Sequence, residues 1–108
     1  MAELPEKPTL KDLQDYIKSI ADERGWDKNN HLEIFLLLSE EIGELAKAVR
    51  NKIGLYAEKK YFPDNEELEL EFADVLNYIF DLANSFNINL ETAFRKKDKI
   101  NAGRIWKT

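Results

Sequence analysis

Two short acidic motifs, EEIGE and EFAD, are the parts of this chain whose residue types and spacing best suit chemistry. In the first motif Glu41 and Glu44 stand three residues apart, so on a helix they project from nearly the same side. Glu71 and Asp74 repeat this spacing in the second motif. Two helices that face each other along these edges would bring four carboxylates together.

Carboxylates that converge in this way repel one another and favour sharing a proton or a cation. A hard divalent ion such as Mg2+ takes oxygen ligands and would relieve the repulsion. The two motifs therefore predict a metal site, and a bound metal of this kind suggests phosphate chemistry.

A simpler interpretation is that the acids form a solvated helix face, with Lys47 and Arg50 as their ion-pair partners. Carboxylates at the border of a large apolar surface cost free energy unless something pairs with them. Both motifs have such a border, which consists of Phe35, Leu36, Leu37, Leu38, Ile42, Leu45 and Val49 for the first and Phe72, Val75, Leu76, Ile79 and Phe80 for the second.

The composition is that of a soluble, folded protein, with 44% hydrophobic and 34% charged residues among 108. We expect one domain over residues 1–108. No apolar run approaches the ~20 residues that cross a bilayer, and the start lacks the pattern of a secretory signal. The absence of cysteine excludes disulfides, thiolate catalysis and sulfur-bound zinc. We therefore expect a cytoplasmic protein that contacts no membrane.

The net charge of −5 argues against a nucleic acid polymer as the main partner. The charge is uneven, because residues 91–108 hold six bases and two acids, a net +4, which leaves −9 for residues 1–90. A basic end of this kind fits either a nucleic-acid arm or a tail that folds back on an acidic, metal-loaded pocket. We favour the second interpretation.

Helical periodicity dominates the chain, and the first eight residues, 1–8, are expected to form an irregular lead-in. Thr9 and Asp12 form a capping pattern for a first helix that ends near Gly25.

After a polar connector, Asn30 and Glu33 form the cap of a second helix. That helix runs toward Asn51 or somewhat beyond, and Gly54 is a candidate end. The segment 52–63 either extends this helix or forms a loop that closes over a site.

Pro63 stops any preceding helix. Asp64, with Glu67, is the predicted cap of a third helix that continues to about Phe86. The fourth helix follows, capped by Asn89 and running through Ile100, and the remaining residues leave the helical pattern.

Four helices on a chain of this length predict an all-α, four-helix bundle-like protomer. The third helix is apolar over more than half of its circumference, which is typical of a helix with neighbours on all sides. Three partner helices hardly cover it, so we expect a homodimer or homotetramer. Its apolar residues are Phe72, Val75, Leu76, Ile79, Phe80, Leu82, Ala83 and Phe86.

The phrases LSEEIGELAKA, which begins at Leu38, and EFADVLNYI, which begins at Glu71, together resemble the MazG-like nucleoside triphosphate pyrophosphohydrolases. The resemblance runs from about Trp26 to Trp106. The wider superfamily includes dimeric all-α dUTPases, dCTP pyrophosphatases and phosphoribosyl-ATP pyrophosphohydrolase. The resemblance implies hydrolysis of a (d)NTP between the α and β phosphates, which gives a nucleoside monophosphate and pyrophosphate.

The resemblance also implies a Mg2+ cofactor, for which Mn2+ is a substitute. Its ligands fall on Glu41, Glu44, Glu71 and Asp74. Glu40 matches a glutamate that binds a second ion or orients water, so Glu40 and Glu41 are the predicted catalytic residues. A carboxylate beside the metal can accept the proton of the attacking water.

Lys97 and Asn101 match residues that contact phosphates in related enzymes, and Arg104 lies one turn further on. Tyr78 occupies a position that can face the nucleotide. For Lys97 the alternative role is that of a solvated residue at the edge of the fourth helix.

Trp26 and His31 match an aromatic residue and a histidine of the dCTP-type members, with the spacing shifted by one residue. The alternatives are that Trp26 packs in the protein and that His31 faces solvent. Those members carry a tryptophan where this chain has Asn51. We expect Trp106 to pack against a neighbouring subunit or the first helix.

Three hypotheses follow, in the order in which we favour them. The chain is a Mg2+-dependent nucleotide pyrophosphohydrolase, a non-catalytic helical oligomer that binds a nucleotide or a protein partner, or a phosphoribosyl-ATP pyrophosphohydrolase. The base, the sugar and the physiological nucleotide do not follow from the residues.

Overall fold

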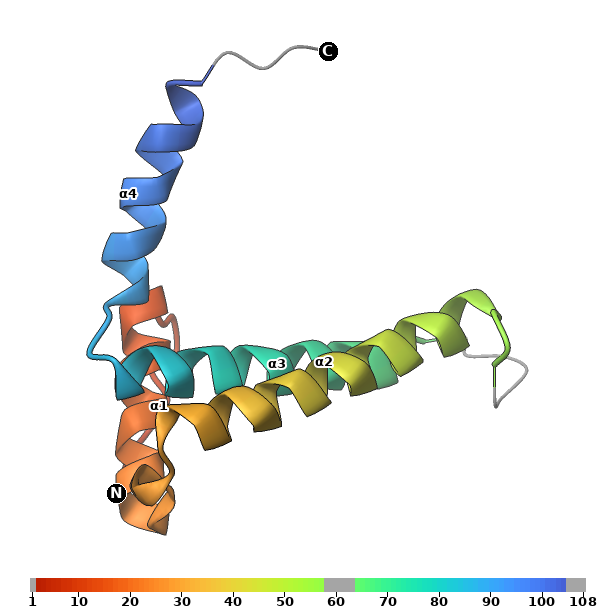
Figure 1. Ribbon diagram of the computed structural model, residues 1–108, viewed down its shortest axis with the longest axis horizontal. Helices are drawn as coiled ribbons and strands as arrows, with labels where there is room; N and C mark the ends of the chain where they lie inside the picture. The colour runs from red at the N-terminus through yellow and green to blue at the C-terminus, as the bar shows by residue number, and fades with distance from the viewer. Residues whose placement is uncertain (1, 58–63, 105–108) are drawn as a thin grey trace.

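The computed structural model describes residues 2–57 and 64–104, and in these ranges it contains helices and turns but no strand. Four α-helices and one short 3-10 helix are found in the described residues (Figure 1), so the predicted all-α fold is confirmed. No helix in this part of the chain combines the length and apolarity that crossing a membrane requires. The elements are α1 Leu10–Arg24, η1 Trp26–Lys28, α2 His31–Ile53, α3 Glu66–Ser85 and α4 Leu90–Ala102.

The first two helix starts are the predicted ones. Thr9 accepts a hydrogen bond from the backbone N–H of Asp12 (3.1 Å), and the Asp12 carboxylate accepts one from the backbone N–H of Thr9 (3.0 Å), which completes a capping box. Asn30 accepts from the backbone N–H of Glu33 (3.0 Å). α1 ends at Gly25 and α2 ends at Gly54. The connector between α1 and α2 forms η1.

These two glycines have φ values of 73° and 80°, a left-handed conformation that costs glycine no steric penalty. The chain therefore leaves each helix by the turn that the sequence signals. After Gly54 the described chain forms a turn through Tyr56. Residues 58–63, with the predicted helix stop at Pro63, lie outside the described residues, and so does Trp106.

Two helix boundaries differ from the predicted ones. Asn65 occupies the N-cap of α3 in place of Asp64, although the Asp64 carboxylate still accepts a hydrogen bond from the backbone N–H of Glu66 (3.2 Å). α4 continues to Ala102, two residues beyond Ile100, because no helix breaker precedes Gly103. Asn89 caps α4 as predicted, through a hydrogen bond from the backbone N–H of Thr92.

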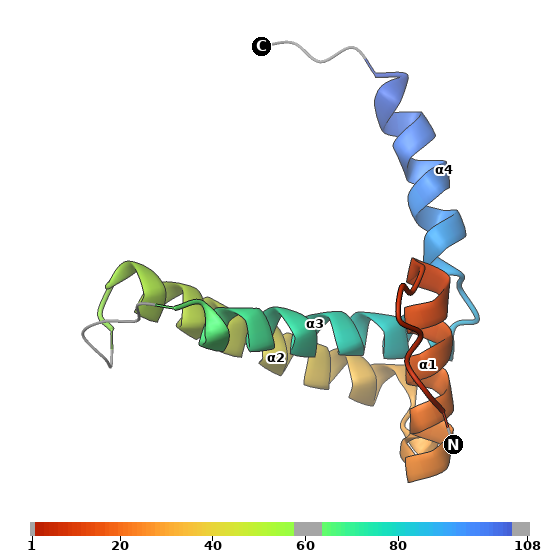
Figure 2. The same cartoon turned by 180° about the vertical axis from the view of Figure 1, so that it is seen from behind.

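The helices form an antiparallel pair with two further helices at one end. α2 and α3 run side by side along their length, α1 crosses the pair near the C-terminal end of α3, and α4 extends away from it (Figures 1 and 2). α4 packs mainly against α1 and has no buried residue. The protomer therefore departs from a closed bundle at α4.

Gln14 of α1 fixes the junction from which α4 departs. Its buried side-chain amide donates hydrogen bonds to the side-chain oxygen of Asn84 (2.9 Å) and to the carbonyl of Ile88 (2.6 Å). Its side-chain oxygen accepts from the backbone N–H of Leu90 (2.9 Å), the first residue of α4. One side chain thus connects α1, the end of α3 and the start of α4.

Little of the chain is buried. Its accessible surface is 8690 Å2, whereas a compact single-chain protein of this size exposes about 6200 Å2. The radius of gyration is 16.8 Å, against about 13 Å for a compact domain of similar length. The buried hydrophobic residues in the described ranges are Ala21, Ile34, Leu38, Ala48, Phe80 and Ala83.

The acids and the exposed apolar side chains lie on different sides of the α2–α3 pair. Each residue of a helix is rotated by about 100° from the one before, so Phe72 lies about 100° from Glu71 in one direction and Asp74 about 60° in the other. The α2 motif has the same order of acid, apolar residue and second acid. Because α2 and α3 are antiparallel, both apolar stripes fall on one side of the pair and the acids on the other.

We call the apolar side of the pair the apolar face. On α2 the residues of this face, with Ser39 and Ala46 completing the series, follow one another at alternating spacings of three and four. This alternation is the 3.5-residue period of helices that pack in coiled coils. The members of the apolar face are all exposed, and they are Leu32, Phe35, Ile42, Val49 and Ile53 on α2, Phe72, Leu76 and Ile79 on α3, and Phe86 at the C-cap of α3.

Candidate active site

Three of the four predicted metal ligands meet between α2 and α3. One carboxylate oxygen from each of Glu41, Glu71 and Asp74 lies within 4.8 Å of the other two. Glu41 on α2 and Glu71 on α3 are half-buried, whereas Asp74, one turn after Glu71, is exposed. We call these three residues the acid trio.

Each of the two half-buried acids has a raised pKa. Burial is the main cause for Glu41, followed by the charges of Asp74 and Glu71. Burial also dominates for Glu71, followed by the charges of Asp74 and Glu44. The fold thus holds these carboxylates in a place that disfavours their charged form.

Glu71 also has an orphaned oxygen. Its Oε2 atom is buried and has no hydrogen-bond partner in the described part of the chain. A buried carboxylate oxygen without a partner is costly, and oxygen donors grouped in this way are what a hard divalent cation binds. The acid trio therefore fits a Mg2+ or Mn2+ ion, because its donors are carboxylate oxygens and one of them has no hydrogen-bond partner in the described residues.

Glu44 and Glu40 lie outside the acid trio. Glu44 is exposed, and its charge contributes to the raised pKa of both Glu41 and Glu71. Glu40 is also exposed, and its charge contributes to the raised pKa of Glu41 and Tyr78. Both predicted residues thus lie near enough to act on the site through their charge.

A cavity of about 270 Å3 adjoins the acid trio, between α1 and the acidic side of the α2–α3 pair. Tyr78 and Trp26, two of the predicted substrate-binding residues, line it. Burial raises the pKa of the Tyr78 hydroxyl, and the charge of Glu41 adds to this effect. The full lining is Ile17, Ile20, Ala21, Arg24, Trp26, Glu41, Asp74, Asn77, Tyr78 and Asp81.

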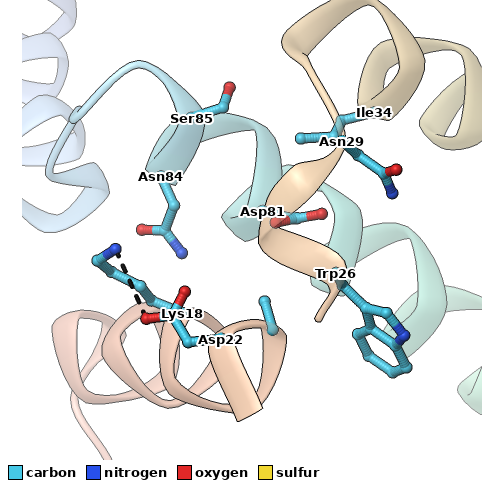
Figure 3. Close-up of a pocket in the computed structure, with 9 residues that line it drawn as sticks. Lys18, Asp22, Trp26, Asn29, Ile34, Asp81, Asn84 and Ser85 are labelled. Carbon is cyan, nitrogen blue, oxygen red and sulfur yellow. Dashed lines mark ion pairs between the residues drawn. The ribbon is translucent and has the colours of Figure 1, made fainter. Parts of the chain in front are cut away.

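A smaller cavity of about 90 Å3 lies beside the first and shares three lining residues with it, Ala21, Trp26 and Asp81. Figure 3 shows this cavity, with Asp81 among the lining side chains and the indole of Trp26 pointing away from Asn84 and Ser85. Trp26 and Asp81 thus lie where the two cavities meet.

Several predicted substrate contacts are not brought to the acid trio within one chain. Lys97 and Asn101 are on α4, and Arg104 follows it, whereas α4 extends away from the α2–α3 pair (Figures 1 and 2). His31 does not line either cavity, and its ring lies 5.1 Å from that of Phe86.

The interpretation in which Arg50 pairs with the acids does not hold. Its guanidinium donates hydrogen bonds to the backbone carbonyls of Leu55 and Tyr56, so it fixes the turn after α2. Asn51, at the position of the dCTP-type tryptophan, is buried and donates to the Glu67 carboxylate (3.3 Å). This side chain connects α2 to α3 and leaves no aromatic ring there.

Sequence reasoning missed three polar residues of the larger cavity, Arg24, Asn77 and Asp81. The guanidinium of Arg24 lies over the Trp26 ring, with its carbon 4.9 Å from the ring centroid. Asp81 lies seven residues after Asp74, at a spacing that returns to the same side of α3. That spacing is the signal that could have identified it.

Residues 29–102 match the family model of the MazG nucleotide pyrophosphohydrolase domain. The uncharacterized protein YpjD of Bacillus subtilis (strain 168) is 35% identical over 85 residues, which cover 79% of this chain and 76% of the relative. The uncharacterized protein YvdC of the same organism is 32% identical over 91 residues, which cover 80% of this chain and 86% of the relative.

Proposed function

The chain belongs to the MazG nucleotide pyrophosphohydrolase domain family, and on this premise we propose that it hydrolyses nucleoside triphosphates between the α and β phosphates in a Mg2+-dependent reaction. The products are a nucleoside monophosphate and pyrophosphate. The observation that carries the proposal is the acid trio with the orphaned Oε2 of Glu71, placed beside a cavity of about 270 Å3.

In this proposal Glu41, Glu71 and Asp74 hold the cation, and Glu44 adds negative charge close to it. A cation held there neutralises phosphate charge and makes water a better nucleophile. Glu40, exposed beside Glu41, is our candidate for the base that takes the proton of the attacking water.

The substrate's nucleoside lies in the cavity between α1 and α3. Tyr78 and Trp26 supply aromatic surface there, and Trp26 stacks on the base. The half-buried hydroxyl of Tyr78 stays protonated and is able to donate a hydrogen bond, because burial and the nearby acids raise its pKa.

We also propose that the chain is a homo-oligomer, with a second copy on the apolar face. Isolated helices shorter than ~12–15 residues are marginal in water, and α4 has 13 residues, none of them buried. The surface in excess of a compact protein is about 2500 Å2 per chain, or about 5000 Å2 for two chains, which is at the upper end of what obligate homodimers bury. An antiparallel helix pair is suited to a two-fold contact with an identical pair.

Assembly also bears on the predicted phosphate contacts. Within one chain α4 leads away from the acids. Lys97, Asn101 and Arg104 therefore act on phosphate only if a second copy presents its α4 to the site.

Pyrophosphate release from canonical and modified triphosphates and from phosphoribosyl-ATP, with Mg2+, Mn2+ or EDTA, tests the proposed reaction. We expect release with either metal and none in EDTA. Nucleotide binding without turnover would favour the non-catalytic oligomer, and turnover of phosphoribosyl-ATP alone would favour the third hypothesis. For Glu→Gln substitutions within the acid trio, Glu69→Gln is a matched control, because Glu69 is an exposed α3 acid outside the trio.

A further inference from the structure

Asp81 is a carboxyl group that the proposed hydrolysis does not use. It is half-buried on α3 and lines both cavities, at the place where they meet beside Trp26. Figure 3 shows its carboxylate among the side chains of the smaller cavity.

Asp81 also lacks a partner. It makes no hydrogen bond or ion pair in the described part of the chain, although Lys18 and Asp22 form an ion pair on the other side of the smaller cavity (4.0 Å). Burial alone raises the pKa of Asp81, since no cation or donor compensates for the lost water. A half-buried acceptor of this kind is suited to a ligand that brings donors.

The position of Asp81 relative to the acid trio indicates which part of a nucleotide it meets. Asp81 follows Asp74 by seven residues, which is ~10 Å along the axis of α3. The triphosphate lies at the acid trio in the proposed function, so the base lies at the far end of the cavity. Trp26 and Asp81 also line the smaller cavity, which Glu41 and Asp74 do not, so we place the base beside Trp26 and Asp81.

Resting on the proposed function, we infer that Asp81 selects the base of the substrate by accepting hydrogen bonds from its N–H groups, and that guanine is the base it favours. A carboxylate has two acceptor oxygens and no donor. Guanine presents a ring N–H and an amino group side by side, which match a carboxylate in a bidentate pair.

The other bases match less well. Adenine and cytosine each present an amino group next to a ring acceptor that faces the carboxylate. Thymine and uracil present one N–H between two carbonyl oxygens. We therefore expect guanine nucleotides to be the best substrates, and thymine and uracil nucleotides to be the poorest.

The test compares dGTP with dITP, which differ only in the 2-amino group of the base. We expect wild-type kcat/KM to be about 10-fold or more higher for dGTP, as one good bidentate contact discriminates between bases. In Asp81→Asn, whose amide replaces one acceptor by a donor, the dGTP/dITP ratio should fall toward one. Asp15→Asn removes the same charge from α1, where Asp15 pairs with Lys11 outside both cavities, and should leave the ratio unchanged.

Binding of the α,β-methylene analogues of dGTP and dITP is measured in parallel by calorimetry, so that selection is scored without turnover. Absence of turnover together with a dGTP preference in binding would reject the proposed hydrolysis and retain the selection by Asp81. Equal wild-type values for the two nucleotides would overturn the inference, and this comparison needs no variant to fold. An unchanged ratio in a folded Asp81→Asn protein would overturn it too.

Discussion

The two sides of the α2–α3 pair are built from the same local sequence order and yet present opposite chemistry. On one side lie the acids of both motifs, of which Glu41 and Asp74 line the cavity. On the other side the apolar residue between the acids of each motif, Ile42 or Phe72, is half exposed or more. The acidic side has excess negative charge, and the apolar side has excess hydrocarbon. In the proposed function a cation binds on the acidic side and a second copy covers the apolar face.

Helical rotation therefore fixes the acidic side and the apolar face of the pair together. A change of one residue in register would turn every side chain of a helix by about 100°, which would move the acids away from the contact between the helices. A substitution on one side should therefore leave the other side intact.

The largest effect is expected on the acidic side. Glu41→Gln and Glu71→Gln each remove one carboxylate charge from the acid trio, and we expect pyrophosphate release to fall by roughly 100-fold or more, a loss typical of disrupted electrostatic stabilisation. The association state should not change. Steady-state kinetics and light scattering measure the two properties, and unchanged kinetics in both variants would contradict the assignment.

On the apolar side, Ile42→Glu should separate the copies. The side chain is 50% exposed in the protomer, so the charge costs little in the monomer, whereas at an interface it would be buried without a partner. We expect the dissociation constant of the oligomer to rise by about 100-fold or more. Sedimentation velocity measures it, with Lys11→Glu on the exposed side of α1 as the control. An oligomer of unaltered affinity would exclude this face as the interface.

At the junction of α1, α3 and α4, away from both sides of the α2–α3 pair, Gln14→Ala should cost stability. It leaves the Leu90 N–H and the Ile88 carbonyl without their partners, and for these part-buried groups we expect a loss of about 1–3 kcal/mol of unfolding free energy. Lys18→Ala, on the exposed surface of the same helix, should cost much less. Urea unfolding compares the two variants, and equal midpoints would show that the junction contributes little.

The smallest effect is a pH dependence of the metal-free protein. Glu41 and Glu71 have pKa values raised above their ordinary value of 4.5. Their protonated forms are therefore favoured in the fold, and stability is lost as the pH rises from about 4.5 through the raised values. The test compares the melting temperatures of wild type and the Glu41→Gln, Glu71→Gln double variant in EDTA. The two temperatures should agree at low pH, and the double variant should melt at the higher temperature as the pH rises above about 4.5. A difference in melting temperature between the two proteins that does not change with pH would contradict this prediction.

The sequence predicts those features that depend on local order. The caps at Thr9, Asn30 and Asn89 and the glycine ends follow from hydrogen bonds within a few residues, and they are found as predicted. The i, i+3 spacing of the acids likewise predicts their approach, and three of the four predicted ligands form one group.

Features set by tertiary packing were not predictable in this way. The direction of α4 depends on the Gln14 network across α1 and α3, which joins residues 70 or more positions apart. The place of Asp81 at the cavity depends on where α1 crosses α3. Residue spacing alone gives no angle between helices.

The most direct measurement is the melting temperature of wild type and Glu71→Gln, each in EDTA and in excess Mg2+, with Glu69→Gln as the control. We expect Mg2+ to raise the melting temperature of wild type and the control by mass action. Glu71→Gln should melt no lower than wild type in EDTA and should not respond to Mg2+. A wild-type protein that ignores Mg2+, or a Glu71→Gln protein that gains as much from it, would contradict a cation shared by Glu41, Glu71 and Asp74.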